Sequence, residues 1–499
     1  HKCKNSDWWL LTTEEIQSRL SAAEAKFDYD CVRSSALRLQ FLEGLAEALA
    51  KKNKTTQEIE LKKLNNISKQ RRKWGRIRRA RKKPAKGLAT KLTQRLPGGE
   101  TRTVEDPQDL IDVSTQVNID RSTQCYSCVF LQDQLLADIG ILADGPAVPQ
   151  ILQGTYIPPP GTDIYTKLLL EELKMPEVVR LKPMAPAKIT TANHVKGWRQ
   201  QRPNTASEPT AVPFPLHIAA SYDAQLAELD ATLRSIPLEF GFSPTDFEQV
   251  TDAAIPKKSN VLDAEKMRNI CLMNPAFNMN NKDFGQQLMA YNELHDLLHD
   301  AQSGSRKWRR AVEVVLQKFL TWDILRQKRR AGFLCSNDAM QCYDRIVHNV
   351  AMLAMMSRGA DPTGLHSLFS TLQNAEHSIM TGYGKSDKPT YGGAARIMEG
   401  LLPIMGILQG NGMGPFIWAI VSSILLNIMM GQGFAGVISG VLTALTLRIV
   451  GYGFVDDTDL NYTAKDNTTP ATELLGTFQS GIDHWEGLLR AYWWSFGHK

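Results

Sequence analysis

The segment from Gly451 to Leu460 constrains the fold more than any other stretch of the chain. A β-rich run, Leu445 to Val455, leads into two adjacent acids, Asp456 and Asp457. Because Asp is common in tight turns, this pattern predicts a strand that delivers paired carboxylates to a hairpin tip. Hard divalent cations prefer oxygen ligands, so such a tip could bind them. A solvated turn without any ligand is the alternative, and the upstream motifs decide between the two interpretations.

A second acidic motif lies upstream of this hairpin. An apolar strand, residues 333–335, precedes Asp338, and Asp344 follows six residues later at the start of a helical run over 346–356. An acid at the end of a strand, followed by a helix, is a metal-binding geometry. The alternative is an acid near a helix N-terminus that interacts with the helix dipole.

A glycine-rich stretch separates the two acidic motifs. It reads Gly-Ile-Leu-Gln-Gly-Asn-Gly-Met-Gly-Pro over residues 406–415. Three glycines within five residues allow close approach of another backbone, and Pro415 is suited to the first turn of a helix. Such a loop could contact a template base or an incoming sugar, although taken alone it is an ordinary glycine-rich turn.

Composition gives only broad limits. The chain has 499 residues, 43% of them hydrophobic and 22% charged, which suits a globular protein of about two to four domains. Seven cysteines without a regular framework predict an intracellular, reducing environment. The first residues have no apolar signal segment, and a chain that starts with His1 is expected to begin inside a longer reading frame.

The N-terminal part is basic and predicted to be helical. A capping box at 12–15 and an amphipathic pattern over 32–64 predict helices. They lead into the densest positive charge of the chain, whose net charge is +6. We predict that this run, interleaved with Trp74, binds a nucleic-acid backbone; a nuclear-localisation segment or a solvated helix face are the alternatives. Its central cations are Arg71, Arg72, Lys73, Arg76, Arg78, Arg79 and Arg81.

In this order, the three motifs resemble motifs A, B and C of reverse transcriptases, in particular those of non-LTR-type retroelements. The likeness covers about residues 216–491 and includes blocks that resemble the fingers and the segment after motif C. These further blocks contain Lys257, Lys258 and Arg268, then Asn280–Lys282, Ser303–Lys307 and Gln479–Glu486. The first three lie on two short, apolar-flanked segments, a pattern that predicts a basic β-hairpin over a nucleotide's phosphates. The three motifs are specific as a set, whereas each one alone is not.

The resemblance implies RNA-directed DNA polymerase activity with two Mg²⁺ (or Mn²⁺) ions as cofactors. Asp338, Asp456 and Asp457 would be the catalytic residues and metal ligands. Two-metal nucleotidyl transfer would follow, in which one ion activates the primer hydroxyl and the other neutralises the triphosphate.

The resemblance also implies a nucleotide site. Tyr343, five residues after Asp338, matches the bulky residue that discriminates against a 2′-hydroxyl, and core packing is its alternative role. Gln409 and Gly410 would lie against the nucleotide and template. Arg268 and Arg306 would bind the triphosphate.

The implied fold class is α+β, with the fingers and palm of a right-hand polymerase and an antiparallel palm sheet backed by helices. The expected parts are a helical, basic extension (1–95), a Pro/Gly-rich linker and helical region (96–250), fingers (251–335), a palm with the three motifs (336–470) and the truncated start of the motif D and thumb region (471–499). Residues 491–499 do not fit the family's continuation, so we expect a frameshift near codon 491. Gly414 also replaces the usual motif B serine.

The expected partners are an RNA template, a DNA primer and dNTPs, in a ribonucleoprotein of the nucleus or cytoplasm. Such elements commonly encode an endonuclease elsewhere in the frame, which is a further expected partner. An RNA-dependent RNA polymerase and a catalytically dead RNA-binding remnant are the alternative functions.

A membrane protein is the alternative from another class. Residues 400–447 carry no charge, and the runs 416–430 and 434–447 are strongly apolar. Each run is shorter than the roughly 20 residues that a membrane span needs, and both lie where the palm core is expected. No membrane is therefore expected as a partner.

Overall fold

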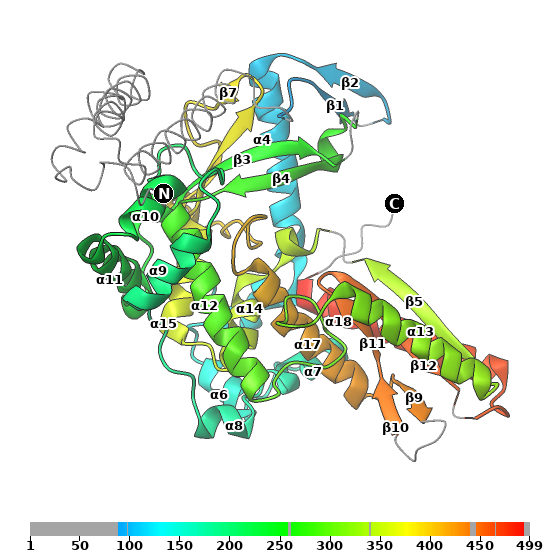
Figure 1. Ribbon diagram of the computed structural model, residues 1–499. Coiled ribbons are helices and arrows are strands. Elements are labelled where there is room, and N and C mark those ends of the chain that lie inside the picture. The colour runs from blue at the N-terminus through cyan, green and yellow to red at the C-terminus, as the bar shows by residue number, and fades with distance from the viewer. Residues whose placement is uncertain are drawn as a thin grey trace, which may run out of the picture. The chain divides into compact units, whose positions relative to one another are not determined.

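Figure 1 shows the computed structural model of the chain, which divides into two compact units, residues 1–88 and 89–499. The structure describes residues 88–96, 98–257, 261–338, 341–439, 446–464 and 466–493. The helices predicted before residue 65 and the basic run that follows them lie outside these ranges and stay predictions. The elements below all belong to the second unit.

Five strands form the larger sheet. They are β3 (Gln249–Pro256), β4 (Met267–Leu272), β6 (Glu376–Thr381), β7 (Gly384–Lys385) and β8 (Tyr391–Gly392). Their order is β4-β3-β6-β7, with β8 also paired to β6. The antiparallel pairing of β3 with β4, which sets Ile255 opposite Arg268, confirms the basic hairpin predicted there. Because β3 and β6 run parallel, the sheet is mixed.

Helix α4 (Pro107–Thr123) packs against this sheet at β6 (Figure 1). It follows the antiparallel hairpin of β1 (Leu92–Arg95) and β2 (Thr101–Val104). Its start is capped by Asp106, whose carboxylate accepts two backbone N–H groups of the first turn. Near its end, the buried Arg121 donates to the carbonyl oxygens of Glu265 and Met267. These bonds join the helix to the start of β4.

Three antiparallel strands form the second sheet, in the order β11-β12-β5. They are β5 (Gly332–Asp338), β11 (Gly451–Phe454) and β12 (Asp457–Thr463). Helix α13 (Ala311–Gln327) packs on one face of this sheet, where the hydroxyl of Tyr452 on β11 donates to Oγ1 of Thr321 on α13 at 2.5 Å. On the other face, the ring of Phe333 stacks on Phe478 of helix α18 (Ala471–Trp493), with centroids 5.3 Å apart. An antiparallel sheet backed by helices is therefore present where the palm is expected.

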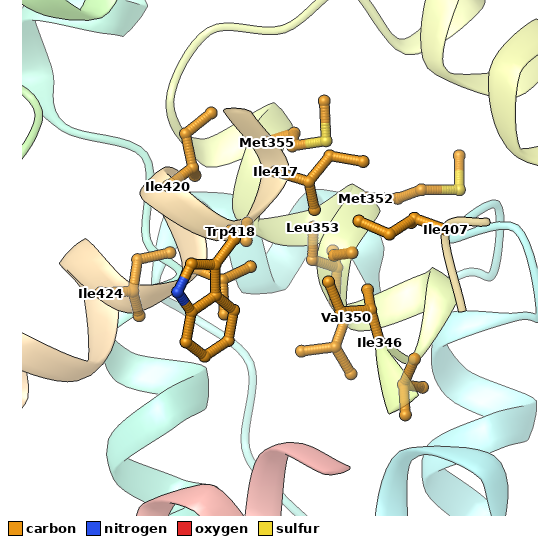
Figure 2. Close-up of a cluster of buried hydrophobic side chains, with 14 of the residues drawn as sticks. Ile346, Val350, Met352, Leu353, Met355, Ile407, Ile417, Trp418, Ile420 and Ile424 are labelled. Carbon is orange, nitrogen blue, oxygen red and sulfur yellow. The ribbon is translucent and has the colours of Figure 1, made fainter. Parts of the chain in front are cut away.

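The main hydrophobic core lies around helices α14 (His348–Ser357) and α17 (Gly414–Gly431). Every residue of α14 is buried. Figure 2 shows its side chains, including Leu353, together with Ile407 and with Trp418 and other side chains of α17. Because α14 and α17 lead out of motifs A and B, this core positions both motifs.

The described part of the second unit contains further α-helices. They are α5 (Asp133–Ile139), α6 (Val148–Gln153), α7 (Ile164–Glu172), α8 (Glu177–Leu181), α9 (Thr191–Gln200), α10 (Phe214–Ala220), α11 (Ala224–Phe240), α12 (Pro275–Leu294), α15 (Pro362–Asn374) and α16 (Ala394–Met398). Helices and strands are thus mixed. The described residues form a five-stranded mixed sheet, a three-stranded antiparallel sheet and two-stranded antiparallel hairpins, which is compatible with the α+β class.

Helix α17 accounts for the first apolar run that could suggest a membrane. Among the described residues it is the one helix long and apolar enough to cross a bilayer, yet 72% of it is buried inside the protein. A helix that is hydrophobic all round is typical of a protein core. The second run contains strand β9 (Gly436–Ser439), which pairs with β10 (Thr446–Ile449) as an antiparallel hairpin. Both observations are consistent with the expected absence of a membrane.

We expect Leu353→Ala to lower the free energy of unfolding by about 2–5 kcal/mol, because it removes a fully buried side chain and leaves a cavity. The control Leu475→Ala alters a side chain that is 53% exposed on α18 and should cost less than about 1 kcal/mol. Urea denaturation followed by circular dichroism measures both. Equal losses in the two variants would contradict the assignment of the core to α14 and α17.

Candidate active site

The two acidic motifs meet on neighbouring strands. Strand β12 begins at Asp457 and β5 ends at Asp338, and the register of the sheet pairs these two residues directly. Phe454 pairs with Asp457 across the β11–β12 hairpin, which leaves Val455 and Asp456 as the turn. Paired residues in antiparallel strands have Cα atoms about 4.5–5.5 Å apart. This confirms the hairpin predicted at Asp456 and Asp457, and it places that hairpin beside the strand end at Asp338.

The two acids of the hairpin are open to solvent. Asp457 is exposed and Asp456 is half-buried. No group of three or more His, Cys, Asp or Glu side chains gathers among the described side chains, but the side chain of Asp338 is not one of them. The candidate donor set is therefore Asp456 and Asp457 together with the residue that the backbone pairs with Asp457.

The turn that carries Asp456 is strained. Val455 has φ of 59°, in the left-handed region that a β-branched residue rarely occupies. Hairpin turns usually place Gly, Asn or Asp at such positions. A conformation of this kind costs on the order of 1–3 kcal/mol and persists only where surrounding contacts fix it. Gln302 and Trp418 supply those contacts through hydrogen bonds to the Val455 backbone.

Tyr343 lies between the hairpin and the glycine loop. It belongs to a short 3₁₀ turn, Cys342–Arg345, that follows β5. A Cβ added to Gly414 would be 3.7 Å from the Tyr343 ring, so the ring packs against the start of α17. Burial raises the pKa of the Tyr343 hydroxyl, and the charges of Cys342 and Asp456 raise it further. The ring is therefore within electrostatic reach of Asp456.

The glycine loop runs directly along the motif A segment. Gly406 has φ of 93°, and a Cβ there would lie 2.8 Å from the carbonyl oxygen of Asp344, so only glycine fits. The Ile407 amide donates to the carbonyl oxygen of Tyr343 at 2.9 Å. His348 Nε2 lies 2.7 Å from the carbonyl oxygen of Gly406. Motifs A and B thus share backbone contacts as well as a core.

The same loop is held on its other side by β4 and α12. The Cys271 amide donates to the carbonyl oxygen of Gln409 at 2.9 Å. Asn278 bonds two groups of the loop, donating from Nδ2 to the Gly410 carbonyl oxygen at 3.1 Å and accepting from the Gly412 amide at 2.6 Å. Gln409 is half-buried and Gly410 is exposed. Both predicted residues are thereby fixed next to the basic hairpin.

Two cations of that hairpin are open to solvent. Arg268 is exposed on β4, three residues before Cys271, which is roughly 10 Å along the strand. Lys257 is also exposed. Burial raises the pKa of Asp344, and the charges of Arg121 and Lys257 oppose that shift. The charge of Lys257 therefore acts within the motif A segment.

The structure gives Arg306 partners within the protein. Its side chain is buried and forms a bidentate ion pair with Glu293, at 2.7 Å from Nε and 2.8 Å from Nη2. Its Nη1 donates to the carbonyl oxygens of His299 and Gln302. These partners use most of its donors, so the arrangement gives no support to the prediction that Arg306 binds a triphosphate. Its visible role is to hold the 299–302 loop.

Sequence reasoning missed Gln302 and Trp418. Gln302 stands immediately before the predicted Ser303–Lys307 block, but a glutamine in a loop gives no local sign of a partner 153 residues later. Trp418 reads as one more apolar residue of α17. The basic residues predicted to bind nucleic acid, 71–81, lie outside the described residues.

No protein-family model matches the chain, and no curated protein matches it.

Protonation of His348 should destabilise the site. The imidazole is fully buried, and burial lowers its pKa from 6.5 to about 4. Because burial disfavours the protonated form, the unfolded state binds the proton at a higher pH than the folded state does. The contribution of His348 to the free energy of unfolding is therefore fully present above pH 6.5 and is lost as the pH falls towards 4. The loss is roughly 3 kcal/mol.

We expect His348→Gln, which keeps an N–H donor for Gly406, to flatten this pH dependence. Urea denaturation of both proteins at a series of pH values between about 7 and 4 measures the difference. Parallel stability curves for wild type and variant would contradict the assignment.

Proposed function

We propose that the chain is an RNA-directed DNA polymerase, the reverse transcriptase of a retrotransposon, with the fingers and palm of a right-hand polymerase. The observation that carries the proposal is the direct pairing of Asp457 with Asp338, next to the turn at Asp456. A palm needs carboxylates from two separate motifs at one place, and this register supplies them. The contacts of Tyr343 and the glycine loop with the same region support the proposal.

Asp338, Asp456 and Asp457 would hold two Mg²⁺ or Mn²⁺ ions. The residues fit such ions, because carboxylates on paired and adjacent backbone positions offer the oxygen ligands that hard cations prefer. Two bound ions supply a lowered pKa for an attacking hydroxyl and neutralise charge on a triphosphate. The protein's own role is to hold the carboxylates in place through the β12–β5 ladder and the turn at Val455 and Asp456.

Tyr343 would lie under the sugar of the incoming nucleotide. Its ring is packed against Gly414, and the charge of Asp456 is among the causes that raise the pKa of its hydroxyl, so the ring would stand near the acids that handle the triphosphate. A fixed aromatic ring excludes a 2′-hydroxyl by steric contact. This role selects dNTPs and separates the proposal from an RNA-dependent RNA polymerase.

Arg268 and Lys257 would bind the triphosphate, since both are exposed on the hairpin next to the glycine loop. Exposed cations attract the negatively charged phosphates and would steer the nucleotide into the site. Gln409 and Gly410 would contact the nucleotide and the RNA template. The basic run at 71–81 would add contacts to the backbone of the template–primer duplex.

Primer extension on an RNA template with dNTPs and Mg²⁺ or Mn²⁺ tests the proposal. We expect Asp456→Asn to lower the rate by about 100-fold or more, because it removes one carboxylate charge from the donor set. The matched control is Asp483→Asn, which changes an exposed aspartate of α18 that contacts Gln479 and should leave the rate unchanged. Extension that survives in Asp456→Asn would contradict the proposed site. A folded wild type that binds RNA but does not extend the primer would favour the inactive remnant.

Selection of the sugar gives a second test. We expect Tyr343→Val to increase use of rNTPs relative to dNTPs by at least about 10-fold, because the smaller side chain leaves room for the 2′-hydroxyl. Tyr343→Phe keeps the ring and should keep the selectivity of the wild type. The measured quantity is the ratio of kcat/KM for a dNTP and its rNTP. An unchanged ratio in Tyr343→Val would assign the ring to core packing alone.

A further inference from the structure

The turn at Val455 and Asp456 is held from outside the hairpin. Val455 adopts a left-handed conformation that its β-branched side chain disfavours. The β11–β12 ladder pairs Phe454 with Asp457 and so leaves the Val455 backbone outside the ladder. Other contacts must therefore hold this conformation and, with it, the direction in which the chain enters Asp456.

Gln302 bonds both polar groups of the Val455 backbone. Its Oε1 accepts the Val455 N–H at 3.2 Å, and its Nε2 donates to the Val455 carbonyl oxygen at 3.1 Å. The Nε1 of Trp418 donates to the same carbonyl oxygen at 2.5 Å. A primary amide supplies both a donor and an acceptor, and this combination is what the Val455 backbone requires.

Gln302 is itself fixed on every side. Its side chain is completely buried, Nε2 also donates to Ser422 Oγ at 2.8 Å, and Oε1 also accepts the Gly304 amide at 2.7 Å. Ser422 belongs to α17 and donates to the Trp418 carbonyl oxygen at 2.7 Å. The amide therefore links the turn to the central helix of the core.

The segment that carries Gln302 lies along the free edge of β11. The Gly453 amide donates to the carbonyl oxygen of Ala301 at 2.7 Å, and the Ser303 amide donates to the carbonyl oxygen of Gly453 at 2.8 Å. A Cβ at Gly304 would clash with the Val455 amide. The approach is thus close enough that only glycine fits at residue 304, and Gln302 has little freedom to move.

We propose that Gln302 is a positioning residue, which together with Trp418 locks the Val455 peptide and thereby places the Asp456 carboxylate beside Asp338. This inference rests on the proposed function. Gln302 does not touch substrate or metal; it acts through the Val455 peptide. Loss of the amide should leave the turn free to relax and weaken the metal site more than the fold.

The test compares Gln302→Met and Gln302→Glu with Gln373→Met. Gln373 is also a buried glutamine, 3% exposed, but its Nε2 donates to the carbonyl oxygen of Ile141 in another part of the unit. Gln302→Met removes both bonds to Val455, whereas Gln302→Glu keeps the shape and replaces the donor with an acceptor. Gln373→Met reports the general cost of losing a buried amide.

The readouts are the Mg²⁺ concentration for half-maximal primer extension, kcat, the Kd for the RNA–DNA duplex, and the Kd for Mn²⁺ measured by electron paramagnetic resonance without nucleic acid. We expect both Gln302 variants to raise the half-saturating Mg²⁺ and the Mn²⁺ Kd by about 10-fold or more and to lower kcat by about 10–100-fold. Duplex affinity should stay within about 2-fold, because the phosphate contacts are made elsewhere. Gln373→Met should lower Tm without moving the metal dependence.

Two outcomes separate failure of the inference from failure of the proposed function. A wild type with Asp456-dependent extension and Mn²⁺ binding, but unchanged metal dependence in folded Gln302→Glu, would overturn the positioning role alone. A wild type with neither activity nor Mn²⁺ binding that depends on Asp456 would overturn the proposed function and the inference with it. If Gln302→Met fails to fold, Gln302→Glu and Trp418→Phe replace it in the comparison. Trp418→Phe should shift the metal dependence less, because Gln302 still bonds Val455 in that variant.

Discussion

The backbone ladder between β12 and β5 is the interaction on which the rest of this structure depends. It runs from the pairing of Thr463 with Gly332 to that of Asp457 with Asp338, and it brings the two acidic motifs together. A slip of one residue would turn every side chain of β12 to the other face of the sheet. Helices α13 and α18 pack on the two faces and resist such a slip. The geometry of the candidate site is therefore a consequence of sheet register, which packing on both faces specifies.

The core beneath the sheet explains why the least charged part of the chain lies between the motifs. Helix α17 is strongly hydrophobic and 72% of it is buried, and polar side chains on it such as Trp418, Ser422 and Asn427 have defined partners. Trp418 Nε1 and Ser422 Oγ both serve the turn that carries Asp456, one directly and one through Gln302. Helix α14 and the glycine loop connect the same core to Tyr343. The buried helix thus provides the hydrogen bonds that hold the strained turn and, with it, the geometry of the candidate site.

Local signals in the sequence predicted much of this correctly. The hairpin at Asp456, the strand end at Asp338 and the basic hairpin with Arg268 were all readable from short patterns of apolar, acidic and turn residues. Contacts over long separations were not readable. The ion pair that occupies Arg306 and the bonds of Gln302 to Val455 depend on how distant segments pack, and no spacing in the sequence encodes them. The central cations of the basic run and the side chain of Asp338 stay outside what the structure describes.

We propose that Asp338, Asp456 and Asp457 together hold divalent cations, and cleavage by a bound iron ion tests this directly. Fe²⁺ can replace Mg²⁺, and with ascorbate and peroxide it produces hydroxyl radicals that cut the backbone close to the bound ion. Mass spectrometry of the fragments then locates the ion without any need for activity. We predict cuts near residues 338 and 456 that Mg²⁺ suppresses and that Asp456→Asn abolishes. Cuts only elsewhere in the chain, or cuts that persist in Asp456→Asn, would contradict it.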